Sequence, residues 1–319
     1  MKEIFISSLE VGETITSFFM LKELNIRVGS NGKKYCDMTL ADKSGEITAK
    51  KWDISEDDEN LFGSFPEYAI VKVKGTITEW QTQKQMKVTL IREANDQDPI
   101  EMMDYVRCAP EDPEEMYEFI LSKAESLGDE DFKKICVKLL TENKDRLLYY
   151  PAASKNHHAE MAGLLYHVKR MLMSGEKLCD VYTYLNKDLV MCGVIIHDIE
   201  KLNEIESNEY GISPGYSFEG QMLGHLVQGV KKIDQVCSEL DVPSEKAIML
   251  EHMMISHHYE PEYGSPRKPM FAEAELLHYL DIVDARMYDY EYALEAMEEG
   301  QVSDRIWTLD NRRIYKQTF

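Results

Sequence analysis

Residues 190–201 read VMCGVIIHDIEK, an apolar run that ends in His197-Asp198 and is followed by Lys201. An apolar run of this kind predicts a buried helix. A carboxylate buried beside such a helix costs free energy unless it is paired or coordinates a metal ion. A histidine and an aspartate at a helix end are common, so the meaning of His197 and Asp198 depends on partners elsewhere in the chain.

Further histidines and aspartates recur on both sides of this stretch. All nine histidines fall between residues 157 and 278. Successive candidate ligands are separated by 30, 27, 32 and 24 residues. Each interval matches one helix plus its connection, so successive helices could deliver one or two ligands to a common cleft. The candidate metal ligands found in this way are His167, His197, Asp198, His225, His257 and Asp281.

The chemistry of this set indicates a divalent metal ion. Imidazole nitrogen and carboxylate oxygen suit Mn, Fe, Co, Ni or Zn, and the lack of a thiolate argues against a structural zinc site. The chain has no CxxC pair, so neither a zinc knuckle nor a disulfide framework is expected. The cysteines, which we predict to be reduced residues of the interior, are Cys36, Cys108, Cys136, Cys179, Cys192 and Cys237.

Helical patterns surround the candidate ligands and predict an all-α bundle over residues 113–319. Stretches such as MYEFILSKAESL and GQMLGHLVQGVKKIDQVCSEL have apolar residues three or four positions apart, which is the spacing of the buried stripe of a helix. Residues 96–112 are acidic and contain prolines, so we interpret them as a linker into a helix that starts near Pro113.

Residues 1–95 are predicted to form five strands instead. Segments such as TITSFFMLKELNIRV, GEITAKKWD and YAIVKVKGTITEW are rich in β-branched and aromatic residues and are separated by turn formers. Five strands of this length suit a small closed barrel, for which the OB-fold is the common form and the SH3-like barrel the alternative. The predicted fold class is therefore multidomain α and β, with an OB-like barrel followed by a helical bundle.

The acidic balance of the chain is concentrated in the helical part. The net charge is −22, but residues 1–95 hold 13 Lys and Arg against 15 Asp and Glu, whereas residues 96–319 hold 23 against 43. Five of the acids in the first segment lie within residues 53–59, which leaves the remainder slightly basic. Polyanion binding depends on such cations, although charge alone does not distinguish it from solubility.

Aromatic and basic residues interleave along the predicted strands. This pattern is typical of a groove in which bases stack on rings and cations follow the backbone of a single strand. Each aromatic residue taken alone is more often part of a barrel core, so only the group supports binding. The residues predicted to bind substrate are Phe18, Phe19, Tyr35, Trp52, Lys33, Lys34 and Lys50, within a wider set that adds Trp80, Lys22, Arg27, Lys51, Lys72 and Lys74.

The segments GLLYHV, IIHDIEK, MLGHL, ISHHYEP and LLHYLDIVDAR resemble, in this order, the motifs of the HD-domain metal phosphohydrolases. The resemblance implies a first metal ion on His167, His197, Asp198 and Asp281, with Asp198 bridging to a second metal or phosphate site on His225, His257 and His258. Two such ions activate a shared water, so no serine or cysteine nucleophile is needed. Asp198 and Lys201 are then the expected catalytic residues, because Lys201 could reach a phosphate oxygen.

Several residues near the candidate ligands can be interpreted in two ways. Asp284 shares a helix face with Asp281 and competes with it as a ligand. Lys201 could be an ordinary helix-end cation. Arg286 has the fork geometry that binds phosphate, but a salt bridge explains it nearly as well. His278 could support Asp281 or simply pack in its helix.

Three further residues lie close to the motifs. His157 and His158 could line the cleft or begin a helix at the surface. Glu200 stands where the HD family usually has glycine, which puts the local turn and the access of phosphate in question, but not the metal ligands.

The order of an OB-like barrel and an HD domain resembles the YhaM-type 3′→5′ exoribonucleases of Gram-positive bacteria over nearly the whole chain. LADKSGEITAKKWD, AASKNHHAEMAGLLYHV and RIWTLDNRRIYK carry this resemblance beyond the HD motifs. It implies hydrolysis of single-stranded RNA from the 3′ end to nucleoside monophosphates, with some activity on DNA. The expected cofactor is one or two divalent ions, with Mn²⁺ favoured and Mg²⁺, Co²⁺, Fe²⁺ or Ni²⁺ as alternatives.

Two other functions fit the same residues. One is a small-nucleotide or cyclic-nucleotide phosphodiesterase whose barrel serves assembly. The other is a non-enzymatic, single-strand-binding accessory of replication or repair with a vestigial HD site. Since no apolar run approaches the ~20 residues of a membrane helix and no secretory signal is evident, a cytoplasmic protein without a membrane partner, able to form a homo-oligomer, is expected.

Overall fold

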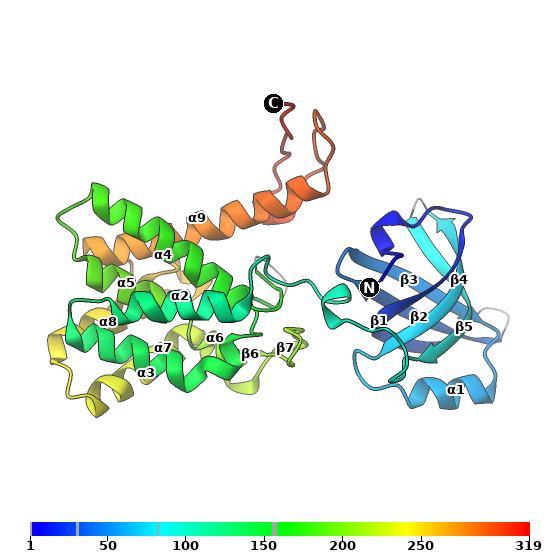
Figure 1. The fold of residues 1–319 in the computed structure, drawn as a ribbon, viewed down its shortest axis with the longest axis horizontal. Helices are drawn as coiled ribbons and strands as arrows, with labels where there is room; N and C mark the ends of the chain where they lie inside the picture. The colour runs from blue at the N-terminus through cyan, green and yellow to red at the C-terminus, as the bar shows by residue number, and fades with distance from the viewer. Residues whose placement is uncertain (1, 30–31, 82, 155–157) are drawn as a thin grey trace. The chain divides into compact units, whose positions relative to one another are not determined.

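The computed structural model describes residues 2–29, 32–81, 83–154 and 158–319. The chain divides into two compact units, Met1–Cys108 and Ala109–Phe319. Figure 1 shows strands in the first unit and mainly helices in the second. Each unit has its own apolar core, so the prediction of a barrel followed by a helical bundle is confirmed.

The first unit is a closed barrel with the strand order β1-β2-β3-β5-β4. The barrel closes because β1 pairs with both β2 and β4, and β3 pairs in parallel with β5. Helix α1 (Glu56–Gly63) lies across one end (Figure 1) and adds Phe62 to the core. The strands are β1 (Thr14–Val28), β2 (Lys34–Asp42), β3 (Gly45–Trp52), β4 (Ile70–Trp80) and β5 (Gln83–Glu93).

Adjacent residues on a strand face opposite sides of the sheet, and this separates Phe18 from Phe19. Phe19 is paired with Val71 and is fully buried in the barrel core. Phe18 is paired with Lys72 and is only partly buried. The prediction that Phe19 binds substrate is therefore wrong, because its ring fills the interior and offers no face to a base.

The segment that follows β5 packs with the barrel as far as Cys108. Asp104, in the short helix η2 (Met102–Asp104), is buried and accepts a 2.9 Å hydrogen bond from the backbone N–H of Lys2. Its other carboxylate oxygen lies 3.0 Å from Nζ of Lys43. Residues 96–112 are predicted to form a linker. In the structure, the buried Asp104 and its charged partners attach the middle of this segment to the first unit.

The second unit consists of helices with one two-stranded sheet, β6 (Ile205–Glu206) and β7 (Gly215–Tyr216). Side chains cap several helix starts, among them Asp112, Asp129 and Ser217, which satisfies backbone N–H groups that have no partner within the helix. The helices are α2 (Pro113–Glu125), α3 (Glu130–Leu147), α4 (Gly163–Val181), α5 (Lys187–Ile196), α6 (Lys201–Glu204), α7 (Phe218–Glu239), α8 (Ser244–Ser256) and α9 (Ala272–Glu295).

Helix α5 is the centre of this unit, as its apolar sequence predicts. Every residue from Leu189 to Ile196 is buried, and α5 packs against α2, α3, α4, α8 and α9. His197 and Asp198, which directly follow α5, are therefore buried inside the bundle. Within the described residues, no helix combines the length and the apolar character needed to cross a membrane.

Candidate metal centre

The helices bring the candidate ligands together around Asp198. On one side, Nε2 of His167, from α4, lies 3.4 Å from Nε2 of His197 and 3.5 Å from Oδ1 of Asp281. Oδ2 of Asp198 lies 3.3 Å from Nε2 of His197. His167, His197 and Asp198 are buried, and one ligand atom of each lies within 4.8 Å of the others.

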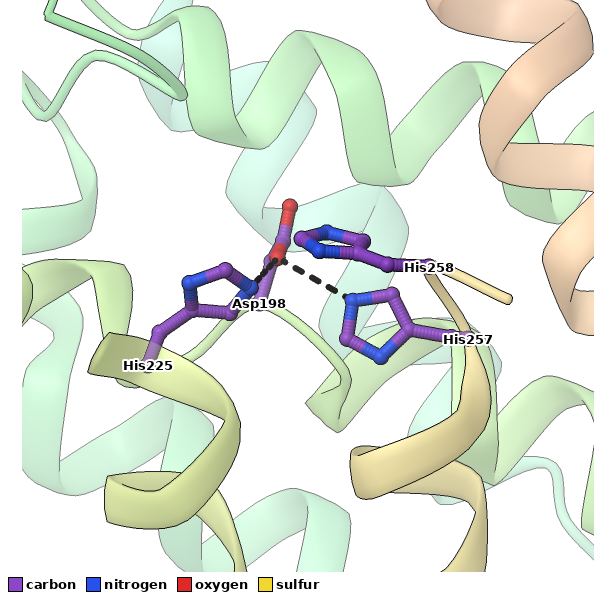
Figure 2. Close-up of side chains that lie close together, drawn as sticks. All are labelled: Asp198, His225, His257 and His258. Carbon is purple, nitrogen blue, oxygen red and sulfur yellow. Dashed lines mark ion pairs between the residues drawn. The ribbon is translucent and has the colours of Figure 1, made fainter. Parts of the chain in front are cut away.

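A second group shares the same aspartate through its other oxygen. Oδ1 of Asp198 lies 3.4 Å from Nε2 of His225 and 3.9 Å from Nε2 of His257. Figure 2 shows these side chains together with His258 turned toward the Asp198 carboxylate. Ligand atoms of all four residues lie within 4.8 Å of one another. Asp198 thus presents one oxygen to each group, as a bridging ligand would.

Three of these ligand atoms have no hydrogen-bond partner among the described residues. They are Oδ1 of Asp198, Nε2 of His225 and Nε2 of His257, and all three are buried. Buried polar atoms are almost always satisfied, so three that converge on one point fit a bound cation. With only nitrogen and oxygen donors, the set suits a divalent ion of the first transition row.

The second ring nitrogen of every candidate histidine is held by an acceptor. This arrangement fixes the ring so that Nε2 faces the other ligands, which is how metal-binding histidines are usually oriented. The Nδ1 partners are Asp284 for His167, the Val194 carbonyl for His197, Glu204 for His225, the Met254 carbonyl for His257 and the Tyr263 carbonyl for His258, at 2.8 to 2.9 Å.

The position of His225 depends on a break in α7. Gly224 has φ 66° and ψ 162°, a conformation outside the helical region that glycine adopts at little cost. The break allows Glu204 to accept hydrogen bonds from both the backbone N–H and Nδ1 of His225, at 3.1 and 2.9 Å. Sequence reasoning missed Glu204; its one signal was an acidic residue shortly after the His-Asp pair.

Asp284 and Asp281 have different positions. Asp281 faces Nε2 of His167, whereas Asp284 contacts Nδ1 of the same ring. Asp284 also lies 2.8 Å from Nε2 of His158 and 2.7 Å from Nε of Arg170. This geometry favours Asp281 as the ligand and gives Asp284 the supporting position, with Arg170 as a partner that the sequence did not suggest.

The charges of the centre favour ionised carboxylates. Burial alone would raise the pKa of Asp198, but His197 and Lys201 hold it well below its ordinary value. Burial likewise opposes a charged His167, yet hydrogen bonds with Asp281 and Asp284 raise its pKa to about 9, so a metal ion bound at Nε2 would displace a proton. Burial and the neighbouring histidines hold the pKa of His257 well below its ordinary value, so its ring is neutral and able to ligate.

Lys201 and Glu200 lie beside the ligands. Nζ of Lys201 is 2.7 Å from Oδ2 of Asp198, and the residue is only 8% exposed. Lys201 is therefore part of the buried centre and not an ordinary surface cation. Glu200 has φ −79° and ψ 0°, a right-handed conformation that does not require glycine, so the departure from the HD pattern leaves the turn intact.

The remaining candidates of the helical unit lie elsewhere. Nδ1 of His278 is 2.7 Å from the carbonyl oxygen of His257, so His278 supports a ligand from behind. The guanidinium of Arg286 donates hydrogen bonds to the Thr308 carbonyl and to Asp310, both at 2.8 Å, which ties it to the C-terminal segment. The phosphate-binding prediction for Arg286 is not supported by this pairing. His157 lies outside the described residues.

On the barrel, the half-buried Tyr35 and the exposed Trp52 form an aromatic pair on neighbouring strands. Their rings stack with centroids 4.6 Å apart, and Trp52 is 49% exposed. Nζ of Lys50 lies 5.8 and 5.9 Å from the two ring centroids. The outer face of β2 and β3 therefore combines stacking surface with a cation.

The other predicted barrel residues are dispersed. Nζ of Lys72 lies 4.9 Å from the ring centroid of Phe18 on the outer face of β1 and β4. Trp80 is exposed at the end of β4. Five of the other cations have acidic partners: Lys22 with Glu46, Lys33 with Asp53, Lys34 with Glu59, Lys51 with Asp58, and Arg27 with Asp37. Nζ of Lys50 itself lies 3.9 Å from Oδ1 of Asp37.

Comparison with known proteins agrees with this arrangement. The model of the OB-fold nucleic acid binding domain matches residues 22–94, and that of the HD domain matches residues 164–286. A protein of Geobacillus sp. (strain WCH70) named 3′-5′ exoribonuclease YhaM is 38% identical over 97% of this chain and 94% of its own length. The chain belongs to the YhaM family of 3′-5′ exoribonucleases.

Other members of the YhaM family are similar over the same length. The protein of that name from Halalkalibacterium halodurans is 37% identical over 97% of this chain and 95% of its own. The one from Bacillus subtilis (strain 168) is 36% identical over 97% of both chains. Membership of the YhaM family, with its HD domain, makes the chain a hydrolase and confirms the class predicted from its motifs.

Proposed function

We propose that the chain is a divalent-metal-dependent 3′→5′ exoribonuclease that releases nucleoside monophosphates from single-stranded RNA. Mn²⁺ is the favoured ion, and single-stranded DNA is a further substrate. The observation that carries this proposal is that buried candidate ligand atoms without hydrogen-bond partners among the described residues converge at Asp198, in a chain of the YhaM family.

The candidate ligands form two groups, each of which would hold one metal ion. Asp198 would contribute one oxygen to each of two ions. His167, His197 and Asp281 would complete one site, and His225, His257 and His258 would complete the other. When bound, divalent ions acidify water and neutralise the charge that develops on a leaving oxygen.

Lys201 is proposed to be the catalytic cation contributed by the protein. One of its three N–H donors is directed at Asp198, at 2.7 Å, which leaves two donors for a phosphate oxygen of the substrate. The carboxylates of Asp198 and Asp281 raise the pKa of this ammonium against the opposing effect of burial. Lys201 therefore stays charged over the whole physiological pH range and can bind phosphate without moving a proton.

The barrel is proposed to bind the strand and so to select a polymer as substrate. Stacking of a base on an aromatic side chain is worth about 1–3 kcal/mol and depends little on sequence. The exposed Trp52 ring, backed by Tyr35, offers such a surface, and Lys50 beside it suits a phosphate. An exonuclease that releases single nucleotides needs to bind its strand with little dependence on sequence, and stacking of this kind provides such binding.

The proposal is tested by digestion of 5′-labelled single-stranded RNA and DNA with protein stripped of metal and then supplied with Mn²⁺. We expect a ladder that shortens from the 3′ end, and nucleoside monophosphates as products. Activity confined to cyclic or small nucleotides would replace the proposal with the phosphodiesterase alternative. Binding of RNA without cleavage under every metal tested would point to a non-enzymatic single-strand-binding protein.

A further inference from the structure

The loop between α8 and α9 begins at the metal centre and carries two adjacent cations. It follows His257 and His258 directly and contains Arg267 and Lys268, both exposed, before α9 starts at Ala272. We refer to residues 259–271 as the α8–α9 loop. None of its residues was a candidate in the sequence analysis, because neither Arg267 nor Lys268 belongs to an HD motif.

A chain of contacts joins Lys268 to the ligands. Nζ of Lys268 lies 4.2 Å from the ring centroid of Tyr259, the residue after His258. The Tyr259 ring stacks on His278 at 4.8 Å, and Nδ1 of His278 lies 2.7 Å from the carbonyl oxygen of His257. Through Tyr259, Lys268 is therefore connected to His258 along the chain and, by way of His278, to the backbone of His257.

The backbone of the loop is held at several points. Tyr259 has φ 66°, a conformation that is costly for a large side chain and persists only where the surroundings enforce it. The Tyr263 carbonyl contacts Nδ1 of His258 at 2.9 Å, and the Met270 N–H donates to Nε2 of His252 at 3.0 Å.

Prolines add to the rigidity of the loop. Pro266 and Pro269 flank Arg267 and Lys268, and their rings restrict the backbone on both sides of the cations. The two charges are therefore presented in a preorganised way, so that little conformational entropy is lost when they bind a partner.

Within the part of the chain that the structure describes, neither Arg267 nor Lys268 is closely paired with an acidic side chain. Cations such as Lys246 and Lys144 are directly paired with acids. Arg267 has no acidic partner among the described residues, and Lys268 has only Glu260, at 3.8 Å. In a region with far more acidic than basic residues, incompletely neutralised cations next to the metal centre point to an anionic partner.

We infer that Arg267 and Lys268 bind the backbone phosphates of the RNA strand next to the phosphodiester that is being hydrolysed. This inference rests on the proposed exoribonuclease function. A single strand offers evenly spaced phosphates, and the guanidinium fork and the ammonium of adjacent residues can contact two of them. The loop would thereby hold the 3′-terminal nucleotides over the centre independently of their bases.

The test compares full-length wild type with the Arg267→Ala/Lys268→Ala variant in Mn²⁺. A matched control is Lys134→Ala/Arg313→Ala, which removes the same charge from exposed residues of α3 and the C-terminal segment. The substrates are a long single-stranded RNA and bis(p-nitrophenyl) phosphate, a small phosphodiester that cannot reach both the centre and the loop.

For the loop variant, we expect KM for RNA to rise by about 10-fold, the effect of losing two charge-assisted contacts that are partly exposed to water. The slope of log(kcat/KM) against log[salt] should fall by roughly 0.7 for each lost contact. Turnover of bis(p-nitrophenyl) phosphate should stay at the wild-type rate, as should all values for the control.

An unchanged KM and salt slope in a variant that still degrades RNA would overturn the inference and leave the proposed function intact. Equal losses on RNA and on the small phosphodiester would also overturn it, because they would indicate a distorted metal centre. If wild type itself degrades no RNA, the proposed function fails first. Lys268→Arg, which keeps the charge, should retain most of the RNA affinity that Lys268→Ala loses.

Discussion

Oδ2 of Asp284 lies 2.8 Å from Nδ1 of His167, and this contact leaves Nε2 of the same ring to face His197 and Asp281. A carboxylate behind a histidine fixes its tautomer and orientation and makes it a stronger ligand. The same carboxylate is held by His158 and Arg170. The metal affinity of the first proposed site is therefore expected to depend on a residue that would not touch the metal.

Asp284→Asn, which keeps the volume but removes the charge, should weaken this support. We expect the Mn²⁺ concentration for half-maximal activity to rise about 10- to 100-fold, the usual effect of losing such a partner. The measurement is a Mn²⁺ titration of RNA hydrolysis. Glu291→Gln is the matched control, because Glu291 pairs with Arg170 at 3.0 Å and has no contact with His167. An Asp284 variant with wild-type metal dependence would refute the supporting role.

Glu204→Gln should act on the second site in the same way. Glu204 holds both the backbone and Nδ1 of His225, so its loss should free the ring and lower activity by about 10- to 100-fold at limiting Mn²⁺. Saturating Mn²⁺ should restore part of this loss. Glu206→Gln, two residues further and exposed, is the control and should match wild type. Equal behaviour of the two variants would show that His225 is oriented without Glu204.

Trp52→Ala should separate strand binding from chemistry. Loss of one stacking surface costs about 1–3 kcal/mol, so KM for long RNA should rise by roughly 10-fold or more. The rate on a dinucleotide, which has no further nucleotides for the barrel to bind, should not change. Trp307→Ala, which removes an equally large exposed ring from the helical unit, should leave both substrates unaffected. Equal losses on both substrates for Trp52→Ala would argue against the division of labour between the units.

The barrel should lose stability in acid through Asp104. The hydrogen bond from the Lys2 backbone lowers the pKa of Asp104 against the effect of burial, and Lys43 lowers it further. A carboxyl whose pKa is lower in the folded state stabilises the fold above its unfolded pKa of about 3.9, and this contribution is lost as the pH falls toward the folded value.

Asp104→Asn should therefore lower the free energy of unfolding by about 2 kcal/mol at neutral pH. The gap between variant and wild type should close as the pH falls below about 4. Denaturant titrations across this range measure it, with the exposed Asp96→Asn as the control. A gap that is the same at all pH values would exclude the charge of Asp104 as its cause.

Much of the fold, and the clustering of the candidate ligands, could be predicted because both follow from local sequence patterns. The apolar run that ends in His197 and Asp198 predicts a buried helix, and α5 is buried along nearly its whole length. Spacing by one helix brought His167, His225 and His257 to the same aspartate. In each case the decisive information lay within one segment or in the order of segments.

The features that could not be predicted depend on tertiary contacts. Phe18 and Phe19 are adjacent and equally apolar, and only the pairing of β1 with β4 decides which one faces the core. Arg286 has the chemistry of a phosphate ligand, but Asp310, distant in sequence, binds it. Contacts between segments far apart in the chain cannot be predicted from the spacing of residues in the sequence.

The supporting residues of the metal centre were missed for a similar reason. Glu204 contacts His225, and Arg170 contacts Asp284, but neither contributes an atom to the group of candidate ligands. Spacing within the sequence identifies the atoms that converge on a site. It does not identify the groups that orient them.

The central claim is that hydrolysis takes place at the centre built around Asp198. The most direct measurement is the rate at which purified Asp198→Ala shortens 5′-labelled single-stranded RNA in Mn²⁺, compared with wild type and with the exposed Asp96→Asn. We expect Asp198→Ala to lose activity by at least about 1,000-fold, since both metal sites lose a shared ligand, while it still binds RNA through the barrel. An Asp198→Ala protein that degrades RNA at the wild-type rate would contradict the account.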